Sequence, residues 1–264
     1  MSLMSLMPLD ILAIAAHRDD VEQTCGGTLL KAAQRGQRTG ILDLTQGEMG
    51  TRGTAEDRGR EAADAARILG AVWRRAPDIP DGRVENTWEN RLKVAAVLRE
   101  TRPHVVILPY WKGRHPDHYT ASILGYEACF LAGLSKLALN SQPSAAAQTN
   151  SGAETVDQES KPLAPHRPFK IIYATLYYDI RPTFVVDIGE QFEKKFASIL
   201  AYKSQFSDQE AGKDLFPAHA EIRARVDSMA RFYGALGGVT HAEPFLQKEV
   251  GLIDDLLAIP VKSI

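Results

Sequence analysis

The stretch Ile11-Leu-Ala-Ile-Ala-Ala-His17-Arg-Asp19-Asp20 decides the fold. It begins as a continuous apolar run, which is typical of a parallel-sheet strand buried on both faces. It ends in one histidine and two adjacent carboxylates, and Gly26-Gly27 and an apolar, helix-like segment follow. Open α/β sheets bind ligands beyond the carboxyl ends of such strands. The stretch therefore predicts an α/β sheet with a site at this strand end.

A second polar cluster, His115-Pro116-Asp117-His118, follows another apolar run at 105–109. Two imidazoles and one carboxylate are a common ligand set for catalytic zinc, with the fourth position left for water. We therefore expect the two clusters to meet around one metal ion. The candidate groups are His17, Asp19, Asp20, His115, Asp117 and His118.

A purely structural interpretation of the same residues exists. Asp19 or Asp20 would cap the helix that follows the first strand. Asp117 would cap the helix that begins near His118, just after a proline. The joint pattern favours the metal site, because both clusters fall at strand ends.

The order of elements predicts the fold class. Apolar runs predict strands over 9–16, 38–45, 71–74, 105–109, 170–178 and 183–188, and helical spacing predicts helices over about 28–34, 55–69, 86–102, 118–131, 191–205 and 218–236. Strand and helix alternate through the first half, which predicts a Rossmann-like, mostly parallel sheet with helices on both faces. Additional strands and helices follow toward the C-terminus. In the common strand order 3-2-1-4, the first and fourth strands are neighbours and their clusters face one crevice.

Length and composition indicate one globular domain over residues 8–264. The 264-residue chain is 44% hydrophobic and 24% charged, with a formal net charge of -2, so we expect no nucleic-acid partner. No apolar run approaches the ~20 residues that span a bilayer, so no membrane partner is expected. The two cysteines, Cys25 and Cys129, are too far apart to suggest a disulfide framework. A reducing cytoplasm is the predicted location.

Two segments are set apart from this domain. Residues 141–168 are rich in Ser, Ala, Gln, Thr and Pro, and we predict an exposed, mobile excursion, because strand patterns resume directly after it. Residues 1–7 carry a doubled Met-Ser-Leu. We interpret them as a cloning remnant and a disordered start, outside the fold.

The motifs resemble those of the PIG-L/LmbE-like zinc-dependent N-acetylglucosamine deacetylases. The similar segments cover nearly the whole chain except 141–168; they are His17–Glu22, Gly26–Thr28, Gly53–Arg58, Arg114–His118, Ala201–Phe206 and Ala242–Phe245. The C-terminal segments are most similar to the bacillithiol-pathway branch, which deacetylates N-acetylglucosaminyl-malate.

The resemblance implies a role for each residue of the two clusters. It makes His17, Asp20 and His118 the ligands of one Zn²⁺ per chain, or of another divalent metal. Asp19 becomes the general base for the attacking water. His115 becomes the acid and electrophile that acts on the acetyl group.

Three further residues carry expectations from the family pattern. Asp117 would orient His115 and keep it protonated, since a neighbouring carboxylate favours the charged imidazole. Arg58 matches a family arginine that lies near the substrate. Arg18 departs from the family motif, which usually has proline between the histidine and the first aspartate.

The expected activity is hydrolysis of the N-acetyl group of an N-acetylglucosamine conjugate, N-acetylglucosaminyl-malate being the first candidate, with release of acetate. A second hypothesis keeps the site and changes the substrate to another N-acyl amino sugar or a thiol conjugate. A third hypothesis is a non-hydrolytic nucleotide-binding α/β protein. No G-x-G-x-x-G loop follows the first strand, which argues against this hypothesis. The expected partner is a small amino-sugar molecule, and the resemblance implies a homo-oligomer, a trimer or hexamer.

Overall fold

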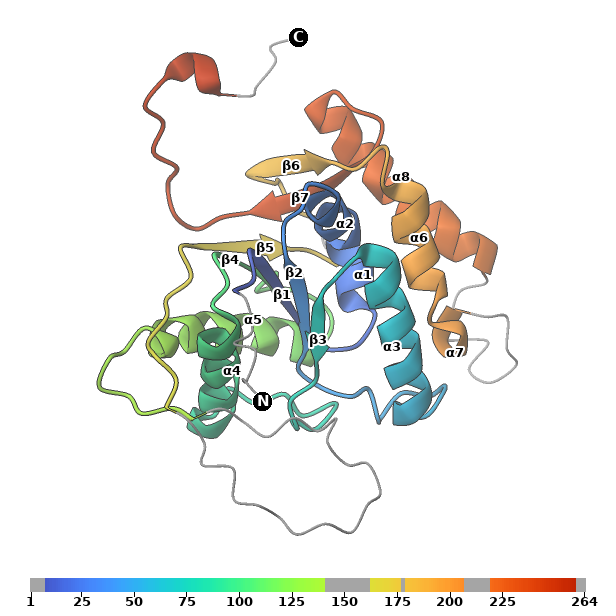
Figure 1. The fold of residues 1–264 in the computed structure, drawn as a ribbon. Coiled ribbons are helices and arrows are strands. Elements are labelled where there is room, and N and C mark those ends of the chain that lie inside the picture. The colour runs from blue at the N-terminus through green and yellow to red at the C-terminus, as the bar shows by residue number, and fades with distance from the viewer. Residues whose placement is uncertain (1–7, 141–161, 177–178, 207–218, 260–264) are drawn as a thin grey trace.

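A seven-stranded sheet lies at the centre of the computed structural model, which describes residues 8–140, 162–176, 179–206 and 219–259 (Figure 1). Its strand order is β3-β2-β1-β4-β5-β7-β6. The strands are β1 (Ile11–Ala15), β2 (Thr39–Asp43), β3 (Trp73–Arg75), β4 (Val105–Pro109), β5 (Lys170–Ala174), β6 (Phe184–Asp187) and β7 (Ala242–Leu246). The five strands from β3 to β5 are parallel, and β7 runs antiparallel to both β5 and β6. The predicted order 3-2-1-4 is confirmed.

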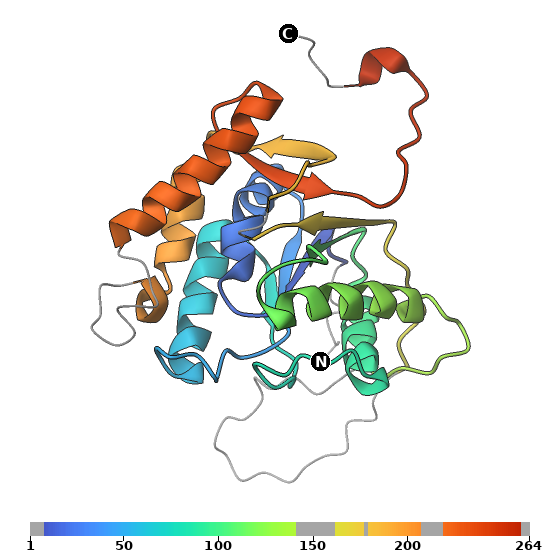
Figure 2. The same cartoon turned by 180° about the vertical axis from the view of Figure 1, so that it is seen from behind.

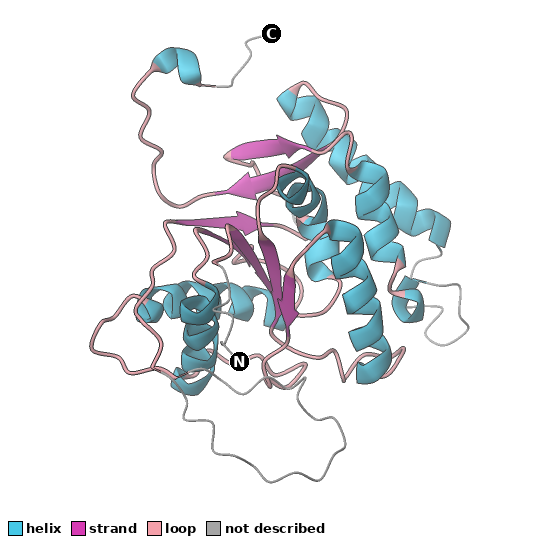
Figure 3. Ribbon diagram, viewed as in Figure 1, coloured by secondary structure: helices cyan, strands magenta, loops and turns pink. Residues whose placement is uncertain are grey.

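Helices cover both faces of the sheet. They are α1 (Asp20–Thr24), α2 (Gly26–Gln34), α3 (Ala55–Leu69), α4 (Trp88–Thr101), α5 (Pro116–Ala132), α6 (Phe192–Leu200), α7 (Lys203–Phe206) and α8 (His219–Gly237). Figures 1 and 2 show α4 and α5 on one face and the other helices on the opposite face. The three layers are plain in Figure 3, with the strands between the two groups of helices. The predicted Rossmann-like architecture is confirmed.

β1 separates the two hydrophobic cores. Successive side chains of a strand point to opposite faces, so Leu12 and Ile14 join the core under α4 and α5. Ala13 and Ala15 face α1 and α2 in the other core. All four side chains are buried. An apolar run without alternation is thus what a central strand between two helical layers requires.

The helix boundaries follow local capping rules. Thr54 and Asp57 form a capping box at the start of α3, and Gly70 ends that helix in the left-handed conformation, with φ of 69°. At α5 the cap is His115, whose side chain accepts the Asp117 N–H, and Pro116 takes the first helical position. The cap of α5 is therefore part of the second polar cluster.

The C-terminal strand β7 is attached to the start of α2 by a buried carboxylate. Glu243 accepts hydrogen bonds from the backbone N–H groups of Gly27 and Thr28, at 2.8 and 2.7 Å, and from Lys195 Nζ at 2.6 Å. A helix N-terminus favours an anion there. A Cβ on Gly27 would lie 2.9 Å from Ile188 and 3.0 Å from the Glu243 carboxylate. Glycine is thus required where α2 meets the C-terminal strands.

The sequence prediction was wrong at three places. The segment 242–246 was not expected to be a strand, but it is β7 and pairs with two neighbours. The helix expected over 191–205 is two helices, α6 and α7. The short helix α1, which begins at Asp20 within the first polar cluster, was not expected either. Residues 1–7 and 141–161, most of the expected excursion, lie outside the described residues.

None of the helices described is long and apolar enough to cross a membrane.

Candidate metal and catalytic site

The two polar clusters meet at the crevice between β1 and β4. These strands are parallel neighbours, with Ala13 opposite Ile107, so their carboxyl ends lie at one edge of the sheet. The chain then leaves β1 toward the α1 face and β4 toward the α5 face (Figure 1). Strand order reverses at this point, which is where doubly wound sheets bind ligands.

Three side-chain atoms at this crevice are mutually close. His17 Nδ1 lies 3.1 Å from His118 Nε2 and 3.4 Å from Asp20 Oδ2, and His118 Nε2 lies 3.3 Å from the same carboxylate oxygen. Ligand atoms about 2.0–2.1 Å from a tetrahedral zinc are about 3.3–3.4 Å from one another. The three residues thus have the spacing that a zinc ligand set needs. His17 and Asp20 are also buried, at 9% and 7% exposure.

The other ring nitrogen of His17 is held by two carboxylates. Nε2 lies 3.2 Å from Asp81 Oδ1 and 3.3 Å from Asp117 Oδ2. A metal-binding histidine commonly donates its second N–H to a carboxylate, which fixes the ring and its tautomer. The sequence analysis did not predict Asp81 as a site residue, because Asp81-Gly82 was interpreted only as a turn.

Other sets of three residues could also hold a cation. Ligand atoms of His17, His115 and His118 lie within 4.8 Å of one another, as do those of His17, Asp81 and Asp117. In the second set, however, the two carboxylates lie at His17 Nε2, whereas His118 and Asp20 lie at His17 Nδ1. Backbone hydrogen bonds hold them there: Asp117 accepts the N–H groups of Gly82 and Val84, and Asp81 accepts that of Met49. Their contact with the second ring nitrogen favours the supporting role for both carboxylates.

The expected pairing of Asp117 with His115 is wrong. The Asp117 carboxylate contacts His17 and the backbone of residues 82 and 84, and it is the Asp117 backbone N–H that contacts His115. Burial lowers the pKa of His115, the charges of His17 and His118 lower it further, and Asp117 opposes these effects only in part. The carboxylate of Asp117 therefore supports His17, and the pKa of His115 lies below its ordinary value.

The tautomer of His115 follows from the same contact. Its Nδ1 accepts the Asp117 N–H at 3.2 Å, so in the neutral ring the hydrogen is on Nε2. The residue is exposed. Its ring centroid lies 4.6 Å from that of His17 and 4.8 Å from that of His118. His115 thus presents an N–H donor at the open side of the cluster.

The charges around His17 favour a cation. Burial lowers the pKa of His17, but hydrogen bonds to Asp117, Asp20 and Asp81 reverse this and raise it to about 12. Burial raises the pKa of Asp20, while His118 and His17 pull it well below its usual range. In the protein without a metal ion, these carboxylates keep the His17 imidazole protonated and positively charged. Metal binding releases such protons, so a divalent cation can replace that positive charge.

Asp19 has an uncommon backbone and a raised pKa. It adopts a left-handed conformation, with φ of 99° and ψ of -22°, at the position before α1. Its side chain makes no capping hydrogen bond to the described residues of that helix, so the structural interpretation of Asp19 is wrong. Burial raises the pKa of Asp19 to about 7, with Arg58 opposing and Asp20 adding to the rise. A strained backbone and a carboxyl with a pKa near 7 are both frequent at catalytic sites.

Arg58 lies beneath this loop and not at the pocket surface. Only 5% of the residue is exposed. Its guanidinium donates to the carbonyl oxygens of Arg18 and Gly47, at 2.6 and 3.2 Å, and lies 3.5 Å from Asp19 Oδ1. The arginine thus holds the loop that carries Asp19. Arg18 turns away toward α3 and donates to the Ala55 carbonyl at 2.7 Å.

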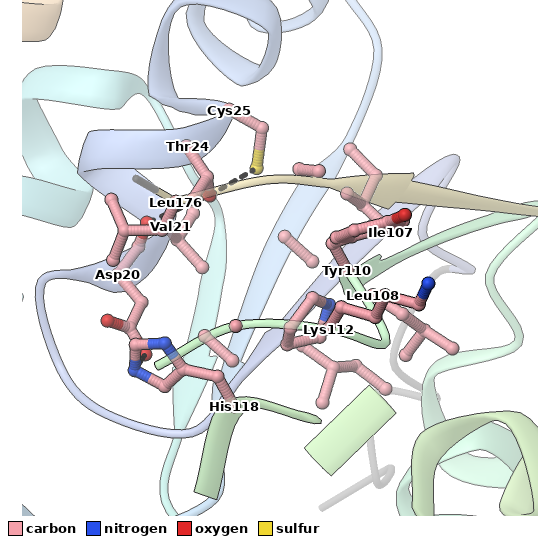
Figure 4. Close-up of a pocket in the computed structure, with 16 residues that line it drawn as sticks. Asp20, Val21, Thr24, Cys25, Ile107, Leu108, Tyr110, Lys112, His118 and Leu176 are labelled. Atoms are coloured by element: carbon pink, nitrogen blue, oxygen red, sulfur yellow. Dashed lines mark hydrogen bonds and ion pairs between the residues drawn. The ribbon is translucent and has the colours of Figure 1, made fainter. Parts of the chain in front are cut away.

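A small pocket opens beside the cluster. Figure 4 shows Asp20 and His118 together at one end, with Tyr110 and Lys112 across the pocket from them. Thr24 and Cys25 from the α1 region form another wall. The pocket therefore joins the candidate metal ligands to a mixed polar and apolar lining.

Comparisons with known proteins agree with this geometry. The family model of PIG-L, described as GlcNAc-PI de-N-acetylase, matches residues 12–129. The chain also resembles the crystal structure of the conserved protein TT1542 from Thermus thermophilus, with 37% identity, 93% of this chain and 98% of that chain covered, and a TM-score of 0.77. The chain belongs to the PIG-L family. The matched residues contain both polar clusters.

Curated relatives within this family have deacetylase names. The chain is 29% identical over 245 residues to the diacetylchitobiose deacetylase of Thermococcus kodakarensis, covering 88% of this chain and 80% of the relative. It is 27% identical over 239 residues to a 1D-myo-inositol 2-acetamido-2-deoxy-alpha-D-glucopyranoside deacetylase of Saccharopolyspora erythraea, covering 75% and 78%. The same fold occurs in GalB, a 4-carboxy-2-hydroxymuconate hydratase from Pseudomonas putida, at 22% identity and a TM-score of 0.67, with 94% of this chain and 99% of that chain covered. The fold alone therefore does not decide the reaction.

The Asp117→Asn variant tests the supporting role of that carboxylate. We expect zinc affinity to fall about 10–100-fold, because the amide loses charge and one acceptor for His17 Nε2. Zinc dissociation constants measured by competition with a chromophoric chelator give the result. The control is Asp78→Asn, an exposed residue of the loop that carries Asp81. An unchanged constant in a folded Asp117→Asn protein would contradict the assignment.

Proposed function

We propose that the protein is a metal-dependent deacetylase that hydrolyses the N-acetyl group of an N-acetylglucosamine conjugate. One divalent cation, zinc by preference, would be held by His17, Asp20 and His118. The observation that carries this proposal is the mutual 3.1–3.4 Å spacing of their three donor atoms at the end of the pocket. Membership of the PIG-L family and the names of the curated relatives support the reaction type.

The residues around the cluster can serve the steps of amide hydrolysis. A divalent cation in such a site supplies Lewis acidity, which lowers the pKa of water and polarises a carbonyl. Asp19 accepts the proton of the attacking water, since its pKa near 7 lets it both take and release a proton at neutral pH. The same carboxyl then returns that proton to the departing amine.

His115 has a different role from the one expected from the sequence. Its Nδ1 accepts the Asp117 N–H, so its Nε2–H donates a hydrogen bond to the oxyanion of the acetyl group. It does not need to carry the proton for the leaving amine, because Asp19 has one to give. Arg58 acts as a positioning residue, through the loop that holds Asp19.

N-acetylglucosaminyl-malate is the substrate that we propose within this class. The support is the similarity of the segments 201–206 and 242–245 to the bacillithiol-pathway branch. The curated relatives act on a chitobiose and on an inositol conjugate by name, so these are the competing substrates. A cytoplasmic location belongs to the same proposal, supported by two buried free cysteines. We also propose a homo-oligomer, a trimer or hexamer.

A primary-amine release assay tests the reaction and the substrate together. We expect the chelator-treated protein to be inactive and stoichiometric zinc to restore activity. With zinc, amine release from N-acetylglucosaminyl-malate should exceed that from N-acetylglucosamine, diacetylchitobiose and the inositol conjugate. Faster release from another acetylated sugar would replace the malate assignment and keep the deacetylase. No release from any of the four would reject the deacetylase proposal.

A further inference from the structure

The small pocket beside the candidate metal ligands has an apolar wall. Aliphatic side chains from the central strands, from α1 and from the segment after β5 form this wall: Ala13, Ala15, Val21, Ile107, Ala174 and Leu176. We call these six residues the apolar pocket. Figure 4 labels Val21, Ile107 and Leu176 around it, with Asp20 and His118 at one end.

Alanine side chains leave the space in this wall. Ala13, Ala15 and Ala174 are 1%, 3% and 3% exposed. Together with Val21 and Ile107 they belong to the core on the α1 and α2 side of the sheet. A methyl side chain extends least from a strand, so three alanines leave room that larger aliphatic residues would fill. Apolar space next to a reactive centre favours an apolar group of the substrate.

The polar side chains of the α1 wall do not change this character. The Thr24 hydroxyl donates to the Asp20 carbonyl oxygen at 2.8 Å. Burial raises the pKa of Cys25, so its thiol is neutral near pH 7. The hydroxyl groups of a sugar need hydrogen-bond partners when they leave water. The wall near α1 therefore suits a hydrocarbon chain better than a sugar ring.

The position of the pocket relative to the cluster indicates which part of an amide enters it. Asp20 and His118 line the pocket. His17, Asp19 and His115 do not line it. In the proposed reaction the amide oxygen lies near His115, and the amide nitrogen faces Asp19, which returns a proton to it. The acyl chain is the third substituent of the amide carbon, and it takes the remaining direction, past Asp20 and His118.

We propose that the apolar pocket binds the acyl chain of the substrate, so that the protein hydrolyses N-propionyl and N-butyryl amides of the amino sugar as well as N-acetyl amides. This inference rests on the proposed function and widens its substrate class. Water adds to the acyl carbon, the C–N bond breaks, and the proton held by Asp19 goes to the departing nitrogen. The acyl group leaves as a carboxylate whose chain lies in the apolar pocket.

A comparison of acyl chains on one sugar tests the proposal. Amine release by the zinc-loaded protein is measured for N-acetyl-, N-propionyl- and N-butyrylglucosamine and for the same three malate conjugates. We expect kcat/KM for propionyl and butyryl within tenfold of the acetyl value on the same sugar. A pocket closed around an acetyl group would lose about 10–200-fold for one added methylene. A fall of more than tenfold, with the acetyl amide still hydrolysed, would overturn the acyl proposal and keep the deacetylase.

Leu176 allows the pocket to be narrowed or widened, because it is only half-buried. We expect Leu176→Phe to lower the ratio of butyryl to acetyl hydrolysis at least tenfold. Leu176→Ala should raise the ratio of hexanoyl to acetyl hydrolysis at least threefold. The matched control is Leu200→Phe, at a half-buried leucine of α6 that does not line the pocket. Unchanged ratios in both Leu176 variants, or equal shifts in Leu200→Phe, would overturn the proposal.

Binding of short carboxylates gives a readout that needs no turnover. Calorimetric titration of the zinc-loaded protein with acetate, propionate and butyrate measures the contribution of each methylene. We expect Kd to fall about fourfold per added methylene, which corresponds to the transfer free energy of one buried CH₂ group. Leu176→Phe should remove this gain, and Leu200→Phe should keep it. A Kd that does not change with chain length would overturn the acyl proposal, whether or not the protein cleaves amides, so its failure and that of the deacetylase proposal are distinguishable.

Discussion

The Asp19→Asn variant is expected to lose about 10²–10⁴-fold in kcat/KM for deacetylation while still binding one divalent cation per chain. That range is typical for loss of a general acid–base group. The amide cannot take a proton from water at neutral pH, and it cannot return one to the amine. His17, Asp20 and His118 are unchanged in this variant, so the cation should remain.

Asparagine suits this test because it changes little else. Asp19 has φ of 99°, and asparagine is among the few residues that tolerate positive φ. The amide oxygen can still accept from Arg58, which lies 3.5 Å away. Zinc content by plasma emission spectroscopy and amine release on the same preparation separate binding from turnover. Asp78→Asn serves as the control, and a normal rate in Asp19→Asn would remove this residue as the base.

Local patterns predicted the first half of the fold because they agree with its tertiary structure there. The strands β1 and β4 are apolar runs buried between two helical layers. The ends of α3 coincide with a threonine cap and a terminal glycine. A continuous apolar run, an N-cap and a C-cap each depend on neighbouring residues only. The alternation of strands and helices then leaves few topologies.

Strand β7 was missed because its local sequence argues against a strand. Proline removes a ladder donor and is rare in interior strands, yet Pro244 pairs opposite Val185. A buried glutamate is costly without partners. Glu243 finds them in Lys195 and in the first turn of α2, 48 and more than 200 residues away in sequence. No local pattern contains those partners, so the strand could not be predicted from its own residues.

The sequence likewise predicted which residues gather at the site. It did not predict which of these residues contact one another. The strand ends predicted that His17 and His118 would meet, and their ring nitrogens lie 3.1 Å apart. Asp81 lies in a loop far from both clusters in sequence, and Asp-Gly is an ordinary turn pair. Asp117 was assigned to its neighbour His115, but the first turn of α5 directs its carboxylate to His17. Side-chain direction on a helix, not distance along the chain, determines that contact.

The His118→Ala variant is expected to lose the cation itself. It removes one of three donor atoms and leaves only His17 Nδ1 and Asp20 Oδ2 of the proposed ligand set. Loss of a supporting partner already weakens binding about 10–100-fold, so we expect loss of a direct ligand to weaken it by at least that factor. At zinc concentrations that saturate the wild type, the variant should retain little metal after gel filtration.

Thermal unfolding gives a readout of this loss that does not need activity. A ligand at 100 times its Kd stabilises the native state by about 2.7 kcal/mol, which corresponds to a rise in Tm of roughly 5–10 °C for a domain of this size. We expect that rise on adding zinc to the chelator-treated wild type and not to His118→Ala. His104→Ala is the matched control, because His104 stacks on Phe169 at a 4.9 Å centroid distance, away from the site. An equal zinc-dependent rise in His118→Ala would mean that the cation binds through other donors, and the ligand set drawn from the two strand ends would be wrong.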